Sequence, residues 1–135
     1  MGADGPAPIG DRRGSGGPYE ERFGYSGVVR VGPLAVTAGC TAMVDGAVAA
    51  AGDAGAQTRI AFRVALSALA EVGVGPDCVV ATRMSIVDVG DSDAVGLAHG
   101  SLFGSIRPAG TMVVVVAGLI DPAMLVEVEL TAWVG

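Results

Sequence analysis

The chain has 135 residues, of which 51% are hydrophobic, so it is long enough for one compact core and short for two. Eight basic residues, all of them arginines, stand against fourteen acidic ones, and the formal net charge is -6. The lack of lysine excludes a Schiff-base mechanism. The acidity argues against a nucleic-acid partner, because that binding depends on neutralised phosphates.

The sequence contains no segment typical of a secreted or membrane protein. The start, MGADGPAPIG, lacks the basic and apolar regions of a secretory signal. The longest apolar stretch, which begins at Met112, has about half of the roughly 20 residues that a membrane helix needs. We therefore expect a soluble, cytoplasmic protein with no membrane partner. Cys40 and Cys78 form no CxxC pair and are expected to be free thiols.

Residues 1–17, rich in Gly, Pro and charge, predict a flexible N-terminal arm whose last part can dock on the domain. Residues 18–135 are predicted to form a single domain. It opens with two short strands, Val28–Val31 and Leu34–Ala38, around a tight turn. A further turn is indicated at Asp45-Gly46.

Helical periodicity follows. Between a plausible N-cap, Asp53, and a plausible C′ residue, Gly73, apolar residues recur every three or four positions. The next stretch, CVVATRMSIVDV, is β-rich and predicts a strand. A second helix is expected from Asp91 or Ser92. Its apolar face carries Val95, Ala98 and Leu102.

The last two predicted strands are the valine run after SIRPAGTM and the segment MLVEVELTAW, in which apolar and other residues alternate. This element order predicts an α+β fold, a sheet with two helices packed on one face and right-handed crossovers. The other face carries Glu127 and Glu129 beside Leu125 and Trp133. Such a mixture is more typical of a subunit interface than of a surface in bulk water.

Four stretches of the chain resemble the Rid (YjgF-type) family: PYEERFGYSGVVRVGPLAVTAG, DAGAQTRIAFRVALSALAEVG, AVGLAHGSLFGSIRPAGTM and LIDPAMLVEVELTA. The resemblance implies a chorismate-mutase-like protomer in a homotrimer, with an inner barrel of sheets and three clefts between subunits. It also implies hydrolysis of reactive imines or enamines to a keto acid and ammonia, with no metal and no cofactor. Other members of the family lack this activity, and some act on RNA or in specialised biosynthesis.

The resemblance also places a departure from the family at Gly110. In active members an arginine directly after the PA of this turn binds the substrate carboxylate, as a planar guanidinium can. Here Ala109 is followed by Gly110, so the ligand is expected to be bulkier or less anionic than a small keto-acid imine. Thr111 and Met112 would line the cleft beside it. Arg107 either swings into the cleft or serves the turn and an intersubunit salt bridge.

Two further residues align with roles in catalysis. Glu127 matches the glutamate that holds the attacking water, although an interface carboxylate is an equal alternative. Neighbouring Glu129 could raise one pKa of the pair by like-charge repulsion. Tyr25 matches a tyrosine of the cleft, and simple packing would explain it nearly as well.

Ala38 and Gly39 match a pair of small residues whose backbone approaches the ligand. Cys40 follows them. With His99, the only histidine, Cys40 could form a nucleophilic pair, but a lone cysteine is more often a small buried hydrophobe. His99 is either a proton donor for the reaction or a helix-surface or interface residue.

These residues support two hypotheses of different classes. The first is a Rid-like enzyme that acts on a reactive imine, enamine or related intermediate. Specialised biosynthesis is one candidate for its pathway. The second is a non-catalytic trimeric module that binds a metabolite or partner protein in its clefts. Endoribonuclease action is a third alternative, which the negative charge disfavours.

Overall fold

The computed structural model describes residues 5–135, in which six strands form one mixed sheet in the order β1-β2-β3-β8-β6-β7. The strands of this sheet are β1 (Asp11–Arg13), β2 (Val28–Val31), β3 (Leu34–Thr37), β6 (Val79–Ile86), β7 (Ala109–Val114) and β8 (Val126–Trp133). The helices are α1 (Pro18–Phe23), α2 (Ala54–Glu71) and α3 (Ser92–Phe103), with 3-10 turns at Pro76–Cys78 and Val89–Asp91. A separate hairpin, β4 (Met43–Val44) with β5 (Ala47–Val48), encloses the predicted turn at Asp45-Gly46.

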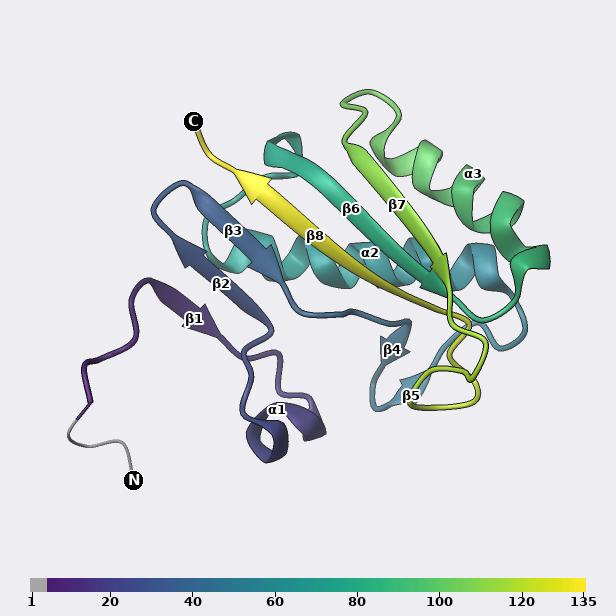
Figure 1. The fold of residues 1–135 in the computed structure, drawn as a ribbon, viewed down its shortest axis with the longest axis horizontal. Helices are drawn as coiled ribbons and strands as arrows, with labels where there is room; N and C mark the ends of the chain where they lie inside the picture. The colour runs from purple at the N-terminus through teal and green to yellow at the C-terminus, as the bar shows by residue number, and fades with distance from the viewer. Residues whose placement is uncertain (1–4) are drawn as a thin grey trace.

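The helices α2 and α3 lie side by side on one face of the sheet, as Figure 1 shows. The predicted α+β fold with two helices on one face is therefore confirmed. Fully buried side chains fill the space between the layers, among them Phe62, Leu69, Phe103, Val128 and Leu130. The opposite face carries no helix, and α1, which the sequence patterns did not predict, buries none of its residues.

The N-terminal arm docks on the domain as a strand. Residues Asp11–Arg13 pair antiparallel with β2, so this last part of the predicted arm belongs to the sheet. The N–H of Gly27 also donates to the carbonyl of Arg13, at 2.9 Å. The part of the arm prediction that concerns residues 1–4 lies outside the described residues.

The sequence signals for α2 correspond to real caps. The Asp53 carboxylate accepts a hydrogen bond from the N–H of Ala56 at 3.0 Å, which satisfies one of the free donors at the helix start. At the other end Gly73 has a φ of 75°, a left-handed conformation that glycine adopts without strain. The helix therefore begins and ends where these two residues predict.

A buried amide at the start of α2 fixes the chain that leads into β8. The side chain of Gln57 is fully buried. Its amide donates to the carbonyl of Ala123 at 3.0 Å, and its oxygen accepts from the N–H of Leu125 at 2.9 Å. A buried amide needs such partners. This contact explains the glutamine of the AQTR motif, because it sets where β8 begins.

Strand β8 lies between β3 and β6 and is antiparallel to both. Every second residue, Val126, Val128, Leu130 and Ala132, is at most 1% exposed and packs towards the helices. Because side chains alternate along a strand, Glu127 and Glu129 face the opposite side. Glu127 lies beside Ser85 of β6, and Glu129 lies beside Arg83.

We predict that Asp53→Ala lowers the free energy of unfolding by about 1 kcal/mol, because the Ala56 N–H loses its partner. Asp53→Asn, which retains an acceptor oxygen, should cost less. Urea denaturation followed by circular dichroism measures both. Equal losses for the two variants would contradict the capping role.

Candidate functional site

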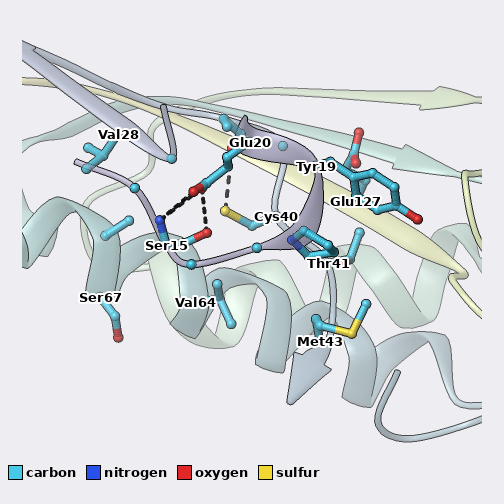
Figure 2. A pocket seen from close by; sticks show the side chains of 18 of the residues that line it. Ser15, Tyr19, Glu20, Val28, Cys40, Thr41, Met43, Val64, Ser67 and Glu127 are labelled. Atoms are coloured by element: carbon cyan, nitrogen blue, oxygen red, sulfur yellow. Dashed lines mark hydrogen bonds between the residues drawn. The ribbon is translucent and has the colours of Figure 1, made fainter. Parts of the chain in front are cut away.

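Glu127 lies at the edge of a hollow of about 900 Å³ that is lined by three parts of the chain. These are the segment from Arg13 to Val28, the loop from Ala38 to Gly46 and one face of α2, as Figure 2 shows in part. Residues Ile120 and Met124 complete the lining. Four of the residues expected from the sequence, Tyr25, Ala38, Gly39 and Cys40, join Glu127 here.

The carboxyl group of Glu127 lies directly over the backbone of Gly39. A Cβ atom at Gly39 would be only 2.7 Å from the carboxyl carbon of Glu127, closer than such atoms approach in proteins. Glycine is therefore needed here for the carboxyl group to take this position. The contact gives the pair of small residues a physical role: they make room for the glutamate.

Backbone hydrogen bonds hold the loop beside β8. The N–H of Cys40 donates to the carbonyl of Val128 at 2.7 Å, and the N–H of Val128 donates back at 2.8 Å. The N–H of Ala38 donates to the carbonyl of Gly27 at 2.8 Å. Because backbone atoms form all three bonds, Gly39 is fixed next to Glu127 from both sides.

Burial raises the pKa of Glu127 above its ordinary value, and the negative charge of Glu129 raises it further. The effect of Glu129 was predicted from the spacing on one face of the strand, whereas the larger effect of burial was not. Among the described residues the Glu127 carboxylate forms no hydrogen bond. It is thus a half-buried base whose oxygens are free to contact a water molecule or a ligand.

Tyr25 stands between this hollow and a smaller one on the helix-free face of the sheet. It lines both, together with Ala38, Gly39 and Glu127. Burial raises the pKa of its hydroxyl, and the carboxylates of Glu20 and Glu127 add to the effect. The phenol therefore stays protonated at neutral pH and can donate a hydrogen bond.

Sequence reasoning missed Glu20, which organises the wall opposite α2. Its carboxylate accepts from the N–H of Ser15 at 2.9 Å and from the Ser15 hydroxyl at 2.6 Å (Figure 2). A Cβ atom at Gly14 or Gly27 would lie 2.9 or 3.0 Å from its carboxylate oxygens. The only signal of this role in the sequence is that Glu20 lies between two glycines, Gly14 and Gly27, that leave space for its carboxylate.

Cys40 lacks the environment of a nucleophile. Burial raises the pKa of its thiol to about 11, and Glu127 contributes to the rise. A reactive cysteine needs the opposite, a positive neighbour that favours the thiolate. Its sulfur contacts the carbonyl of Ala38 at 3.4 Å. Cys40 is therefore a small apolar wall residue, and it has no contact with His99.

His99 lies on the helix side of the sheet, away from Glu127. Its Nε2 atom is 2.8 Å from the hydroxyl of Thr82, a buried residue of β6. The ring packs edge-on against Phe62 and also contacts Phe103. Burial lowers the pKa of His99, which keeps the ring neutral near pH 7. Within one chain it cannot donate a proton at Glu127.

The turn residues Arg107 to Met112 also lie apart from Glu127, since β6 separates β7 from β8. Gly110 faces the helix side, because a Cβ atom there would be 3.4 Å from the Thr82 hydroxyl. Met112 points the same way, towards Gly96 of α3. Ala109 and Thr111 are exposed on the edge strand and face the side that carries Glu127.

Arg107 follows α3 by four residues and has a left-handed conformation, with a φ of 52° that is uncommon for a residue other than glycine. Its N–H donates to the carbonyl of Phe103 at 2.8 Å. The side chain is exposed and has no ion-pair partner among the described residues. Arg107 thus forms the turn, and in this chain it does not reach the hollow.

Comparison with known proteins identifies the relatives of this fold. The family model described as Endoribonuclease L-PSP matches residues 19–134. The chain belongs to this family, the YjgF family. A protein from Streptomyces coelicolor is 43% identical over 121 residues, which are 90% of each chain.

Solved structures of the YjgF family agree with the fold. A member from Mycobacterium tuberculosis is 41% identical, covers 92% of this chain and 98% of its own, and superposes with a TM-score of 0.82. TdcF of Escherichia coli, solved with bound serine, has a TM-score of 0.77 at 20% identity, over 96% of this chain and 100% of its own. At that identity the likeness to TdcF concerns the fold alone.

Two classes of site have no support in residues 5–135. No helix there is long and apolar enough to cross a membrane. In the same residues no three His, Cys, Asp or Glu side chains gather as a metal site would require.

We predict that Glu127→Gln stabilises the fold at pH 7. A carboxyl group whose pKa is raised in the folded state binds more protons there than in the unfolded chain, so its contribution to stability falls as pH rises. The amide removes this cost. The advantage of the variant should shrink as pH falls through the raised pKa of Glu127 towards about 4.3, the ordinary pKa of glutamate, and should be absent below it.

Urea unfolding of both proteins at several pH values from 3.5 to about 8 measures this difference. Glu129→Gln, on the same strand and the same face, is the matched control for the loss of one carboxylate. A Glu127→Gln variant that is less stable than the natural protein at pH 7 would refute the inferred burial cost.

Proposed function

We propose that this protein is a Rid-like hydrolase that deaminates a reactive imine, enamine or related intermediate, a role that fits specialised biosynthesis. The position of Glu127 carries the proposal: a half-buried carboxyl group of raised pKa over the Gly39 backbone, with Tyr25 in the same hollow. Such a carboxylate is suited to general base catalysis near neutral pH.

The proposed reaction uses one water molecule. Glu127 takes a proton from the water as its oxygen bonds to the imine carbon, and the electrons of the C=N bond move to nitrogen. Nitrogen then receives the proton that Glu127 holds, which gives a neutral carbinolamine and restores the carboxylate. Glu127 next carries the hydroxyl proton to nitrogen, and the C–N bond breaks as the C=O bond forms. The products are a carbonyl compound and ammonia, so atoms and charge balance. The protonated Tyr25 hydroxyl would orient the substrate through a hydrogen bond.

The site would be completed by a second copy of the chain. Among residues 5–135, no helix covers the face of the sheet that carries Glu127, and no strand pairs with the outer edge of β7. Val114 of β7 and Trp133 of β8 are exposed. In the homotrimer that we propose, Ala109 and Thr111 of one subunit would face the cleft of its neighbour. Cys40 and Ala38 would supply the small wall residues on the near side.

Gly110 limits the substrates that fit this proposal. No guanidinium stands at this position, so the turn offers no bidentate contact to a carboxylate next to the reacting carbon. In TdcF, a protein of the same fold, serine is the bound ligand. In this chain Gly110 faces the helix side of the sheet, so the missing charge, rather than space beside Glu127, favours a substrate that is less anionic near its imine.

A non-catalytic trimeric module is the alternative, and the missing arginine at Gly110 favours it. Such a module would bind a metabolite or partner protein in its clefts without turnover. RNA cleavage, suggested by the family's description, has less support. The net charge of -6 would repel phosphates, and we do not propose a nucleic-acid partner.

We predict that the protein releases ammonia from freshly generated imines, and that Glu127→Gln lowers the rate about 100-fold or more through loss of the base. Coupled ammonia detection over a panel of imines with different side chains measures the rate. Glu129→Gln, an exposed carboxylate on the same face, should retain most of the activity. Absence of ammonia from every imine, or equal rates for Glu127→Gln and the natural protein, would rule out the hydrolase.

A further inference from the structure

The hollow that contains Glu127 offers few positive charges to an acidic ligand. The chain has no lysine, so any cationic side chain that binds a carboxylate must be an arginine or the histidine. His99 faces Thr82 on the other side of the sheet. Of the eight arginines, only Arg13 and Arg63 line this hollow.

Arg13 is already occupied. Its guanidinium donates two hydrogen bonds to the Asp11 carboxylate, at 2.7 and 3.1 Å, and forms an ion pair with it. Arg63, in contrast, has neither a hydrogen-bond partner nor an ion-pair partner among residues 5–135. Its exposed guanidinium therefore keeps all of its donors available to a ligand.

The helix geometry explains why Arg63 reaches the hollow and a neighbouring arginine does not. The residues of α2 that line it, Ile60, Arg63, Val64, Ser67, Ala68 and Glu71, are spaced by three or four and share one face. Arg59 is one turn earlier, is equally exposed and does not line the hollow. Glu71, two turns after Arg63, would repel an anion and confine it to the Arg63 end of this face.

Arg63 and Glu127 lie on different layers of the fold. Glu127 is on the face of β8 that points away from the helices, and Arg63 is on α2. Packed layers of secondary structure are about 10 Å apart. A small 2-imino acid, whose carboxylate is bonded to the reacting carbon, is short compared with this spacing. A longer molecule can touch both residues, and the hollow has the volume for one.

We propose that Arg63 is a specificity-determining residue that binds an acidic group at the α2 end of the hollow, several bonds from the carbon that reacts at Glu127. The substrate class is thus an imine or enamine with a remote carboxylate. This inference rests on the proposed hydrolase for the identity of the reacting group, whereas the binding of the carboxylate by Arg63 is independent of turnover.

Binding of stable ketones, which resemble the carbonyl product, tests the proposal without catalysis. The probes for calorimetric titration are 6-oxoheptanoate, whose carboxylate is separated from the ketone by four methylene groups, its uncharged methyl ester, and 2-oxobutyrate. The natural protein should bind 6-oxoheptanoate about tenfold more tightly than the ester or 2-oxobutyrate, because a charge-assisted hydrogen bond between Arg63 and the carboxylate contributes affinity of this size. Arg63→Ala should abolish that preference, Arg63→Lys should retain part of it, and Arg59→Ala should leave it unchanged.

Circular dichroism and the midpoint of urea unfolding show whether each variant is folded. Equal binding of acid and ester by the natural protein, a preference that survives in folded Arg63→Ala, or no binding of any probe would overturn the proposal. Ammonia release from an uncharged imine by the natural protein separates the two claims, because it requires the hydrolase and does not require the anion site. If the natural protein released no ammonia but bound 6-oxoheptanoate through Arg63, the hydrolase would fail and the anion site would stand.

Discussion

The alternation of side chains along β8 determines which residues enter the core and which face carries Glu127. Val126, Val128, Leu130 and Ala132 must be buried against the helices, and each buried aliphatic side chain of this size contributes roughly 1–3 kcal/mol. A shift of one residue would expose all four. The core therefore also fixes Glu127 on the opposite face, where the backbone bonds between Cys40 and Val128 bring Gly39 beneath its carboxyl group.

Strong local signals made most of the fold predictable. The capping residue Asp53, the left-handed Gly73 and the period-two pattern of β8 each describe a local preference that the packed structure retains. The N-terminal elements were missed for a physical reason. Strand β1 has three residues and depends on pairing with β2, and α1 has six residues, none of them buried. Such elements leave little periodicity in a sequence.

The candidate site was less predictable, because proximity across the fold leaves no periodic trace. Resemblance to the family selected Glu127, Tyr25 and Gly39, which the structure brings together, and also Gly110. The structure places Gly110 on the helix side of the sheet, together with His99, which was selected as the only histidine. The role of Glu20 depends on a fold-back onto Ser15. The raised pKa of Glu127 depends mainly on burial, which only the packed structure determines.

Gly39 lets the Glu127 carboxyl group occupy a partly buried position that raises its pKa. The direct measurement is NMR titration of that carboxyl carbon in the natural protein and in Gly39→Ala, with Gly75→Ala, where an added Cβ meets open space, as the control. We expect the Glu127 carboxyl group to have a raised pKa in the natural protein and in the control. In Gly39→Ala its pKa should fall towards the ordinary value, because the carboxyl group is displaced into water. An ordinary glutamate pKa in the natural protein, or the same raised pKa in folded Gly39→Ala, would contradict this expectation.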